Sequence, residues 1–187
     1  HHNVLDADFY LRISDEMYLK RLIVGGFEKV YEITKVFRNE GIDYDHNPEF
    51  TMFEAMIAYK DYTYGMDLIE EIIEQTAQKV LGKTNFDYQG TEISVARPWV
   101  RLSMVESIKK YCGVDPLSWD TFNDAVIAAH RIDAIDPAKL SEIKKFNSIG
   151  EIIAFVFEEA VEAKLIQPTI IFDYPVENSP LAKKCND

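Results

Sequence analysis

Cysteine, positive charge and long apolar runs are all scarce in this chain of 187 residues. Its two cysteines, Cys112 and Cys185, lie far apart without the spacing of a zinc site, which excludes a disulfide scaffold and favours a reducing cytoplasmic compartment. No apolar run approaches the roughly 18 residues of a membrane span, and no signal peptide is recognisable. The net charge of −12 provides no general attraction for polyanions, so any nucleic-acid contact must be local or must lie outside this chain.

The periodicity of the apolar residues predicts an α+β fold, with a mainly antiparallel sheet flanked by helices. Segments rich in β-branched and aromatic residues predict strands at 9–13, 27–37, 49–60 and 169–172. Two short strands, at 86–88 and 91–95, are expected to form a hairpin about the turn at 89–90. Segments with apolar residues at helical spacing lie at 15–24, 63–81 and 103–165. We therefore divide the chain into a core segment at 1–102, a helical insertion at 103–165, and a return strand and loop at 166–187.

A carboxylate interrupts one face of the strand expected at 49–60. Side chains alternate across a strand, so Glu54 shares its face with apolar residues such as Met52 and Met56. A carboxylate in such a place costs free energy unless it is paired. We expect Glu54 to meet a cation, either a ligand or Arg38 at the end of the preceding strand; a purely structural ion pair is the alternative.

The turn between these two strands is unusually rich in functional side chains: Arg38, Glu40, His46, Asn47 and Phe50. Arginine suits bidentate binding of phosphate or carboxylate, a carboxylate can accept from an amine, and phenylalanine offers a stacking face for a base. A histidine such as His46, taken alone, is more often a solvated loop residue. The cluster as a whole indicates a site for a nucleotide and a small charged substrate.

The same residues resemble motif 2 of the class II aminoacyl-tRNA synthetases, in its lysyl-tRNA synthetase form. The resemblance rests on Phe-Arg-Asn-Glu-Gly at 37–41 and His-Asn-Pro-Glu-Phe-Thr-Met at 46–52. Flanking matches lie at 10–13, 18–22, 24–28, 157–159, 165–169 and 174–182. The resemblance covers nearly the whole chain, most loosely at 112–148.

The resemblance implies a role for each residue of the turn. Arg38 would be the catalytic arginine that holds the α-phosphate of ATP and the carboxylate of the amino acid. Glu40 would accept from the adenine amino group, and Phe50 would stack on adenine. His46 and Asn47 would also contact the nucleotide.

Lysine-binding residues follow from the same resemblance. Glu16 would bind the α-ammonium group of L-lysine, and Glu54 would receive its ε-ammonium group. The family usually has a tyrosine two residues beyond this glutamate, but here that position is Met56, and a thioether is a weak acceptor. Losing a hydrogen bond to a charged group costs on the order of 1.5–3 kcal/mol, and Tyr59, expected on the opposite face, is no simple substitute.

The family reaction would form lysyl-adenylate from lysine and ATP and then transfer lysine to tRNA(Lys). Such chemistry depends on positioning and charge stabilisation. The resemblance also implies Mg²⁺ and a homodimer. However, the chain lacks the motif that builds the dimer, the acidic residues that bind Mg²⁺, the motif 3 arginine and the anticodon-binding domain. We therefore expect an incomplete catalytic domain that is inactive alone, with no metal site of its own.

Two other hypotheses remain open. A lysine-ligase paralogue that modifies elongation factor P shares motif 2 but diverges around the amino-acid pocket, as at Met56. The long insertion and Leu-Ile-Gln-Pro-Thr at 165–169 favour the synthetase instead. The second is a non-catalytic binding module derived from a synthetase. The catalytic segments that the chain lacks motivate this hypothesis, because such a module does not need them.

Overall fold

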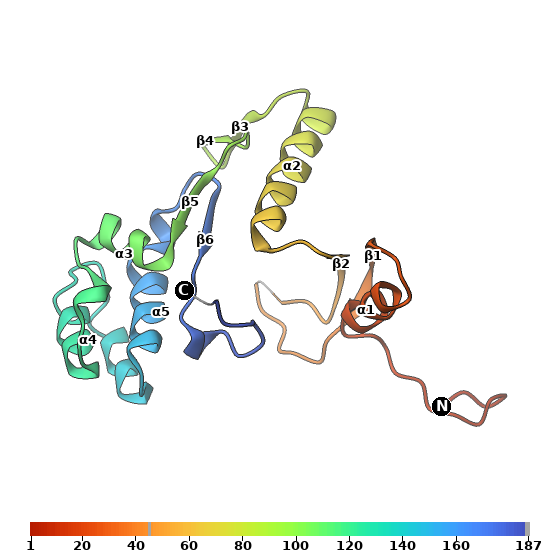
Figure 1. The fold of residues 1–187 in the computed structure, drawn as a ribbon, viewed down its shortest axis with the longest axis horizontal. Coiled ribbons are helices and arrows are strands. Elements are labelled where there is room, and N and C mark those ends of the chain that lie inside the picture. The colour runs from red at the N-terminus through yellow and green to blue at the C-terminus, as the bar shows by residue number, and fades with distance from the viewer. Residues whose placement is uncertain (45, 186–187) are drawn as a thin grey trace. The chain divides into compact units, whose positions relative to one another are not determined.

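The computed structural model describes residues 1–44 and 46–185, and the chain divides into two compact units at 1–65 and 66–187 (Figure 1). Each unit is described by itself below. The fold is mixed, with helices and small sheets, as the α+β prediction requires.

The first unit is built on a β-hairpin with one helix beside it. Helix α1, Glu16–Val24, is followed by β1, Lys29–Phe37, and β2, Glu49–Ile57, which pair antiparallel. β-Branched and aromatic residues recur along both strands and favour the extended backbone. A long polar turn separates the strands, and the backbone amide of Arg38 still donates to the carbonyl of Pro48, 2.9 Å away.

The two faces of this hairpin differ in exposure. One face carries Glu32 and Glu54 among partly buried apolar side chains, and it includes the fully buried Val36. The opposite face exposes Tyr31 and Phe53, whose rings lie 6.1 Å apart. Helix α1 contacts both strands and buries Leu19. The half-buried face is therefore the one on which a ligand site can be enclosed.

Helix α2, Tyr62–Leu81, begins in the first unit and continues into the second. Two short ladders follow in the second unit. The strands β3, Asn85–Tyr88, and β4, Thr91–Ser94, form an antiparallel hairpin, whereas β5, Val100–Ser103, and β6, Thr169–Phe172, pair in parallel.

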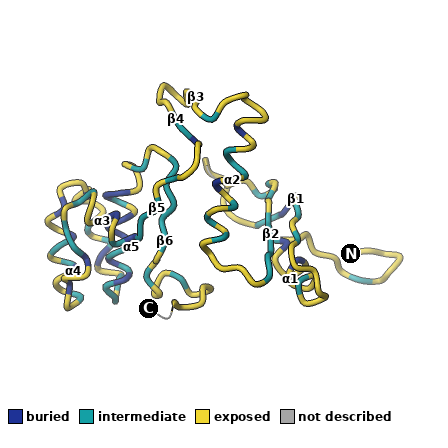
Figure 2. The backbone as a smooth tube through the Cα atoms, turned by 45° about the horizontal axis from the view of Figure 1, so that its top comes forward, coloured by how far each residue is buried: buried dark blue, intermediate teal, exposed yellow. Residues whose placement is uncertain are grey.

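Three α-helices form the main core between β5 and β6 in sequence. They are α3, Met104–Cys112, α4, Phe122–Ala129, and α5, Ile149–Ala160, and each begins with a capping box. Short 3₁₀ turns lie at Pro116–Ser118, Lys139–Lys145, Glu162–Lys164 and Val176–Asn178. Figure 2 shows buried residues concentrated in these helices. The most enclosed side chains of this core are Met104, Ile108, Ile152, Val156 and Val161.

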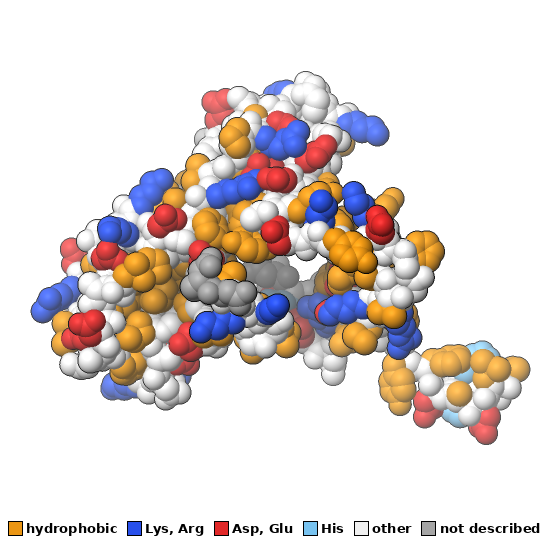
Figure 3. Space-filling model, viewed as in Figure 1, with side chains coloured by type: hydrophobic (Ala, Val, Ile, Leu, Met, Phe, Trp, Pro, Cys, Tyr) orange, Lys and Arg blue, Asp and Glu red, His pale blue; other side chains and the backbone are white. Residues whose placement is uncertain are grey.

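Ion pairs connect α2 to β5 and to the segment that precedes it, and charged side chains of both signs lie side by side on the surface of the molecule (Figure 3). The Arg97 guanidinium donates to Glu74 at 2.7 Å, and Arg101 donates to the nearly buried Glu70 at 2.9 Å. The bond from the Arg97 backbone amide, followed by that from its guanidinium, lowers the pKa of the Glu74 carboxyl below its ordinary value.

Several details differ from the sequence predictions. Residues 9–13 form no strand, although the carbonyl of Arg12 accepts from the amide of Phe37 at 2.8 Å. Strand β2 ends at Ile57, so Tyr59 lies in an exposed turn with a φ of 59°. The sequence analysis does not predict strand β5, Val100–Ser103. Among the described residues the strands form three separate pairs, one of them parallel.

Within the part of the chain that the structure describes, no helix is both long and apolar enough to cross a membrane.

Candidate functional site

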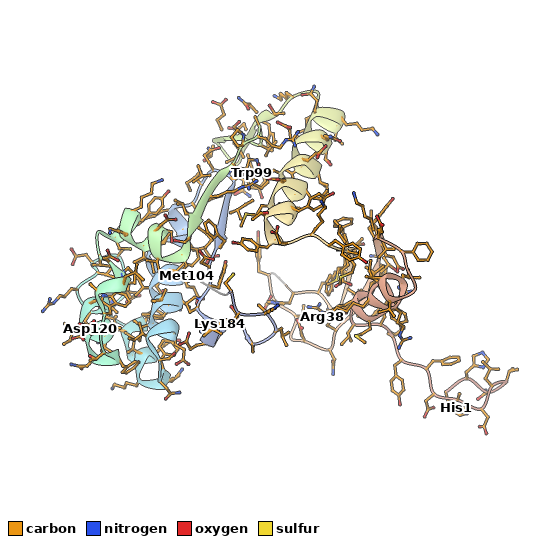
Figure 4. The ribbon with its side chains drawn as sticks, in the orientation of Figure 1. His1, Arg38, Trp99, Met104, Asp120 and Lys184 are labelled. Carbon is orange, nitrogen blue, oxygen red and sulfur yellow. The ribbon has the colours of Figure 1, made fainter. Side chains whose placement is uncertain are left out.

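A cation and an aromatic ring lie together where the hairpin strands meet the polar turn. The guanidinium carbon of Arg38 is 5.3 Å from the centre of the Phe50 ring (Figure 4). Its Nε donates to the carbonyl of Ile13 at 3.3 Å. Arg38 forms no ion pair with a carboxylate of the described residues, so its charge is available to an anionic ligand beside a ring that can stack.

The other turn residues are exposed. Nδ1 of His46 lies 2.8 Å from Oδ1 of Asp43, and the His46 amide donates to the same oxygen, so this histidine helps to shape the turn. Glu40 and Asn47 are exposed on the same turn. The structure thus places all five predicted residues at one end of the hairpin.

Glu54 lies further along the half-buried face and does not contact Arg38. Its cross-strand partner is Glu32, whereas Arg38 lies opposite Pro48, so the predicted ion pair between Arg38 and Glu54 is wrong. Glu32, the residue opposite Glu54, is six positions before Arg38 in the chain, so the register of the ladder keeps the two side chains apart. Instead, Oε2 of Glu54 accepts from the backbone amide of Asp15 at 2.5 Å.

Three carboxylates and one cation meet at this point of the first unit. Nη1 of Arg12 donates to Oδ1 of Asp15 at 2.7 Å and to Oε1 of Glu32 at 2.8 Å. The bond to Asp15, and next the bond to Glu32, raises the pKa of the Arg12 guanidinium above its ordinary value. Glu54 is the third carboxylate, and it forms no ion pair within residues 1–44 and 46–185. The group therefore carries more negative than positive charge.

Asp15 is the most enclosed of these residues, with an exposed fraction of 0%. It is the N-cap of α1, yet its side chain accepts no capping hydrogen bond from that helix. Its Oδ2 is buried without a hydrogen-bond partner among the described residues. An aspartate at this position usually binds the amides of the first helical turn, so its engagement with Arg12 is a departure from ordinary capping.

The remaining predicted residues flank this cluster. Glu16 lies in the first turn of α1, where it pairs with Lys20 one turn later, and both side chains are about half exposed. Met56 lies on the face of Glu54, opposite Val30, and is partly buried. Among the described residues, neither Glu16 nor Met56 contacts Arg38.

Sequence reasoning missed Arg12, Asp15 and Glu32. The signal for Glu32 was present, because the argument that singled out Glu54 applies equally to a second carboxylate among Val30, Thr34 and Val36. Arg12 and Asp15 could not be assigned in this way, because their contact depends on how α1 packs against the hairpin.

The hairpin thus presents two kinds of subsite on one face. Phe50 and Glu54 are four residues apart on β2, which corresponds to roughly 13 Å along a strand. One end offers a guanidinium and an aromatic ring, and the other offers a carboxylate that pairs with no cation in the described part of the chain. Such an arrangement suits a ligand that combines an anion, a flat ring and an ammonium group.

All of residues 1–187 match the family described as tRNA synthetases class II (D, K and N), and the chain belongs to this family. Its curated relatives include lysine–tRNA ligases from several bacteria. The chain is 54% identical to that of Pelotomaculum thermopropionicum over 185 residues, and 53% identical to that of Thermoanaerobacter sp. strain X514 over 187 residues. It is 52% identical to that of Clostridium tetani over 187 residues.

These alignments cover 98–100% of this chain but only 35–36% of each relative. The chain therefore spans about a third of the length of the lysine–tRNA ligases that it matches.

Proposed function

We propose that this chain is part of a lysine–tRNA ligase, which activates L-lysine with ATP and transfers it to tRNA(Lys). The observation that carries the proposal is the identity of 52–54% to lysine–tRNA ligases along essentially the whole chain. The hairpin contributes the ATP and lysine subsites, and residues outside this chain complete the active site.

Arg38 and Phe50 form the nucleotide subsite in this proposal. The Phe50 ring stacks on adenine, and Arg38 moves from the ring face to the α-phosphate and the lysine carboxylate. Because the side chain of Arg38 donates a single hydrogen bond, of 3.3 Å, to the residues that the structure describes, this movement disrupts little there. Arg38 then stabilises the negative charge that develops as the lysine carboxylate attacks the α-phosphorus and pyrophosphate leaves. Glu40, His46 and Asn47 contact the nucleotide from the turn.

Glu54 and Glu16 form the lysine subsite. Oε2 of Glu54 is fixed by a backbone amide, which leaves Oε1 for the ε-ammonium group. Glu16 exchanges its partner Lys20 for the α-ammonium group, and an exposed pair of this kind contributes little to stability. Met56 provides apolar contact to the lysine chain beside Glu54 but no strong acceptor.

Several properties of the complete protein are part of the same proposal. It binds Mg²⁺ and tRNA(Lys), forms a homodimer and acts in the cytoplasm. Among the described residues, no three histidine, cysteine, aspartate or glutamate side chains are placed so that they could hold a metal ion together, so we derive no step through Mg²⁺ from this chain. In the complete protein the hairpin joins a larger antiparallel sheet, residues 1–102 and 166–187 belong to the catalytic core, and residues 103–165 are its helical insertion.

The test is the fate of activated lysine in the complete protein that contains this chain. With ATP and radiolabelled lysine, we expect lysyl-adenylate to form and the label to reach tRNA(Lys). Transfer to elongation factor P and not to tRNA would favour the lysine-ligase paralogue, for which Met56 is the motivating observation. A properly folded protein that forms no adenylate would favour a non-catalytic module.

A further inference from the structure

The carboxylates of Glu32 and Glu54 occupy directly opposite positions on the antiparallel strands β1 and β2. Side chains at such positions share one face, with Cβ atoms about 4.5–5.5 Å apart, and like charges there repel each other. Each of the two carboxylates must therefore be stabilised from elsewhere. The two carboxylates are stabilised by different groups.

Arg12 stabilises Glu32 but not Glu54. Its Nη1 bridges Glu32 at 2.8 Å and the buried Asp15 at 2.7 Å, so one cation serves two carboxylates. Within residues 1–44 and 46–185, the one hydrogen bond that Glu54 accepts comes from the backbone amide of Asp15, at 2.5 Å. Asp15 therefore links the cation to Glu54. Its side chain accepts a hydrogen bond from Arg12, and its backbone amide donates a hydrogen bond to Glu54.

We propose that Arg12 is a positioning residue for the ammonium group of the amino-acid substrate, acting through Asp15 and Glu32 on Glu54. By neutralising Glu32, Arg12 leaves Glu54 as the carboxylate of this face that has no cation among the described residues. By anchoring Asp15, it holds the amide that orients Glu54. This inference rests on the proposed function, since it concerns the subsite for the lysine side chain.

The unusual capping of α1 supports this assignment. An N-cap aspartate that bound its own helix would stabilise it, and Asp15 gives up this bond to contact Arg12. Glu54 in turn brings its carboxylate to the N-terminus of α1, where the helix dipole favours a negative charge. The arrangement fixes the Glu54 carboxylate before a substrate arrives.

The experiment compares Arg12→Gln with a matched control, Lys35→Gln, in the complete protein. Lys35 also lies in the first unit and pairs with a carboxylate, Glu49, at 3.2 Å, but on the exposed face of β1. Amino-acid-dependent ATP–pyrophosphate exchange gives KM for lysine and for ATP separately. Arg12→Gln should raise the lysine KM by about tenfold, the effect of weakening one charge-assisted hydrogen bond, and should change the ATP KM by less than about twofold. Lys35→Gln should change neither.

A double-mutant cycle tests whether Arg12 acts through Glu54. In a Glu54→Gln background, the same Arg12→Gln substitution should change kcat/KM for lysine by no more than about twofold. A second tenfold loss in that background would overturn the proposal, because Arg12 would then act independently of Glu54. Equal effects of Arg12→Gln on lysine and ATP would also overturn it, since they would indicate a merely structural role.

A second variant is the control for misfolding caused by Arg12→Gln. Arg12→Gln alone leaves the Asp15 charge buried without its cation, whereas Arg12→Gln combined with Asp15→Asn removes both charges. The combined variant should fold and should still show the raised lysine KM, because Glu32 is no longer neutralised. An unchanged lysine KM in the folded combined variant would overturn the proposal. Absence of lysine-dependent exchange in the unsubstituted protein would instead overturn the proposed function, and this inference with it.

Discussion

Replacement of Gly150 by alanine tests how tightly the turn at Val176–Asn178 packs on α5. A Cβ atom at this position would lie 2.8 Å from the Cβ of Pro175 and closer still to Oε2 of Glu177. The flexible Glu177 side chain can swing away, but the Pro175 ring is rigid and must shift. Ordinary carbon contacts are about 3.5–4.0 Å, so the required displacement is about 1 Å.

The expected cost follows from two opposing effects. Overpacking of this kind costs about 1–3 kcal/mol, while alanine gains about 0.5–1 kcal/mol over glycine within a helix. We expect Gly150→Ala to destabilise the protein by about 0.5–2 kcal/mol, which corresponds to a lowering of Tm by a few degrees. The displaced turn leads into Ser179-Pro180-Leu181-Ala182, part of the family resemblance, so the activity should fall as well.

Thermal unfolding of the complete protein, with Gly65→Ala as the matched control, measures this effect. Gly65 lies in α2, its φ is not positive and a Cβ atom added there would meet nothing within 4 Å, so alanine should raise the stability. A Gly150→Ala protein as stable as the unsubstituted one, beside a stabilised Gly65→Ala protein, would refute the close packing of the turn on α5.

Three further predictions concern the complete protein. Arg38→Ala should abolish lysyl-adenylate formation in an exchange assay, and near-normal activity would contradict the role assigned to Arg38. Glu54→Gln should raise the lysine KM by about 10- to 100-fold, the effect of a lost charged hydrogen bond, and the ATP KM far less; equal effects would mean that Glu54 is structural. Arg97 lowers the pKa of the Glu74 carboxyl. The ionised Glu74 side chain therefore stabilises the folded protein above about pH 4.5, and this stabilisation is lost as the pH falls through the folded-state pKa. Between about pH 6 and pH 3, the Tm of a Glu74→Gln variant should therefore fall less than that of the unsubstituted protein, and parallel curves would exclude this contribution.

The local elements of the fold could be predicted from the sequence, because each has its own signal. Apolar spacing located α1 and α2 within a residue or two, and the polar turn separated β1 from β2 as expected. The exposed segment at 9–13 has the composition of a strand but lacks a partner, and composition alone cannot supply one.

The polar contacts of the site were harder to predict than its location. The sequence placed Arg38 and Glu54 on adjacent strands, but their pairing depends on the register, which sets Glu54 opposite Glu32. The contacts of Arg12 and Asp15 depend on the packing of α1 against the hairpin, so no periodicity reveals them. Propensity describes single segments, whereas these contacts join residues far apart in the chain.

The central claim is tested most directly by amino-acid-dependent ATP–pyrophosphate exchange with the complete protein. Lysine, ornithine, asparagine and aspartate are compared under the same conditions, since Met56 stands where the lysine family usually has tyrosine. We predict exchange with lysine and little or none with the other three amino acids. Preferred exchange with any of those three, or no exchange by the folded protein, would contradict the assignment of this hairpin to a lysine–tRNA ligase.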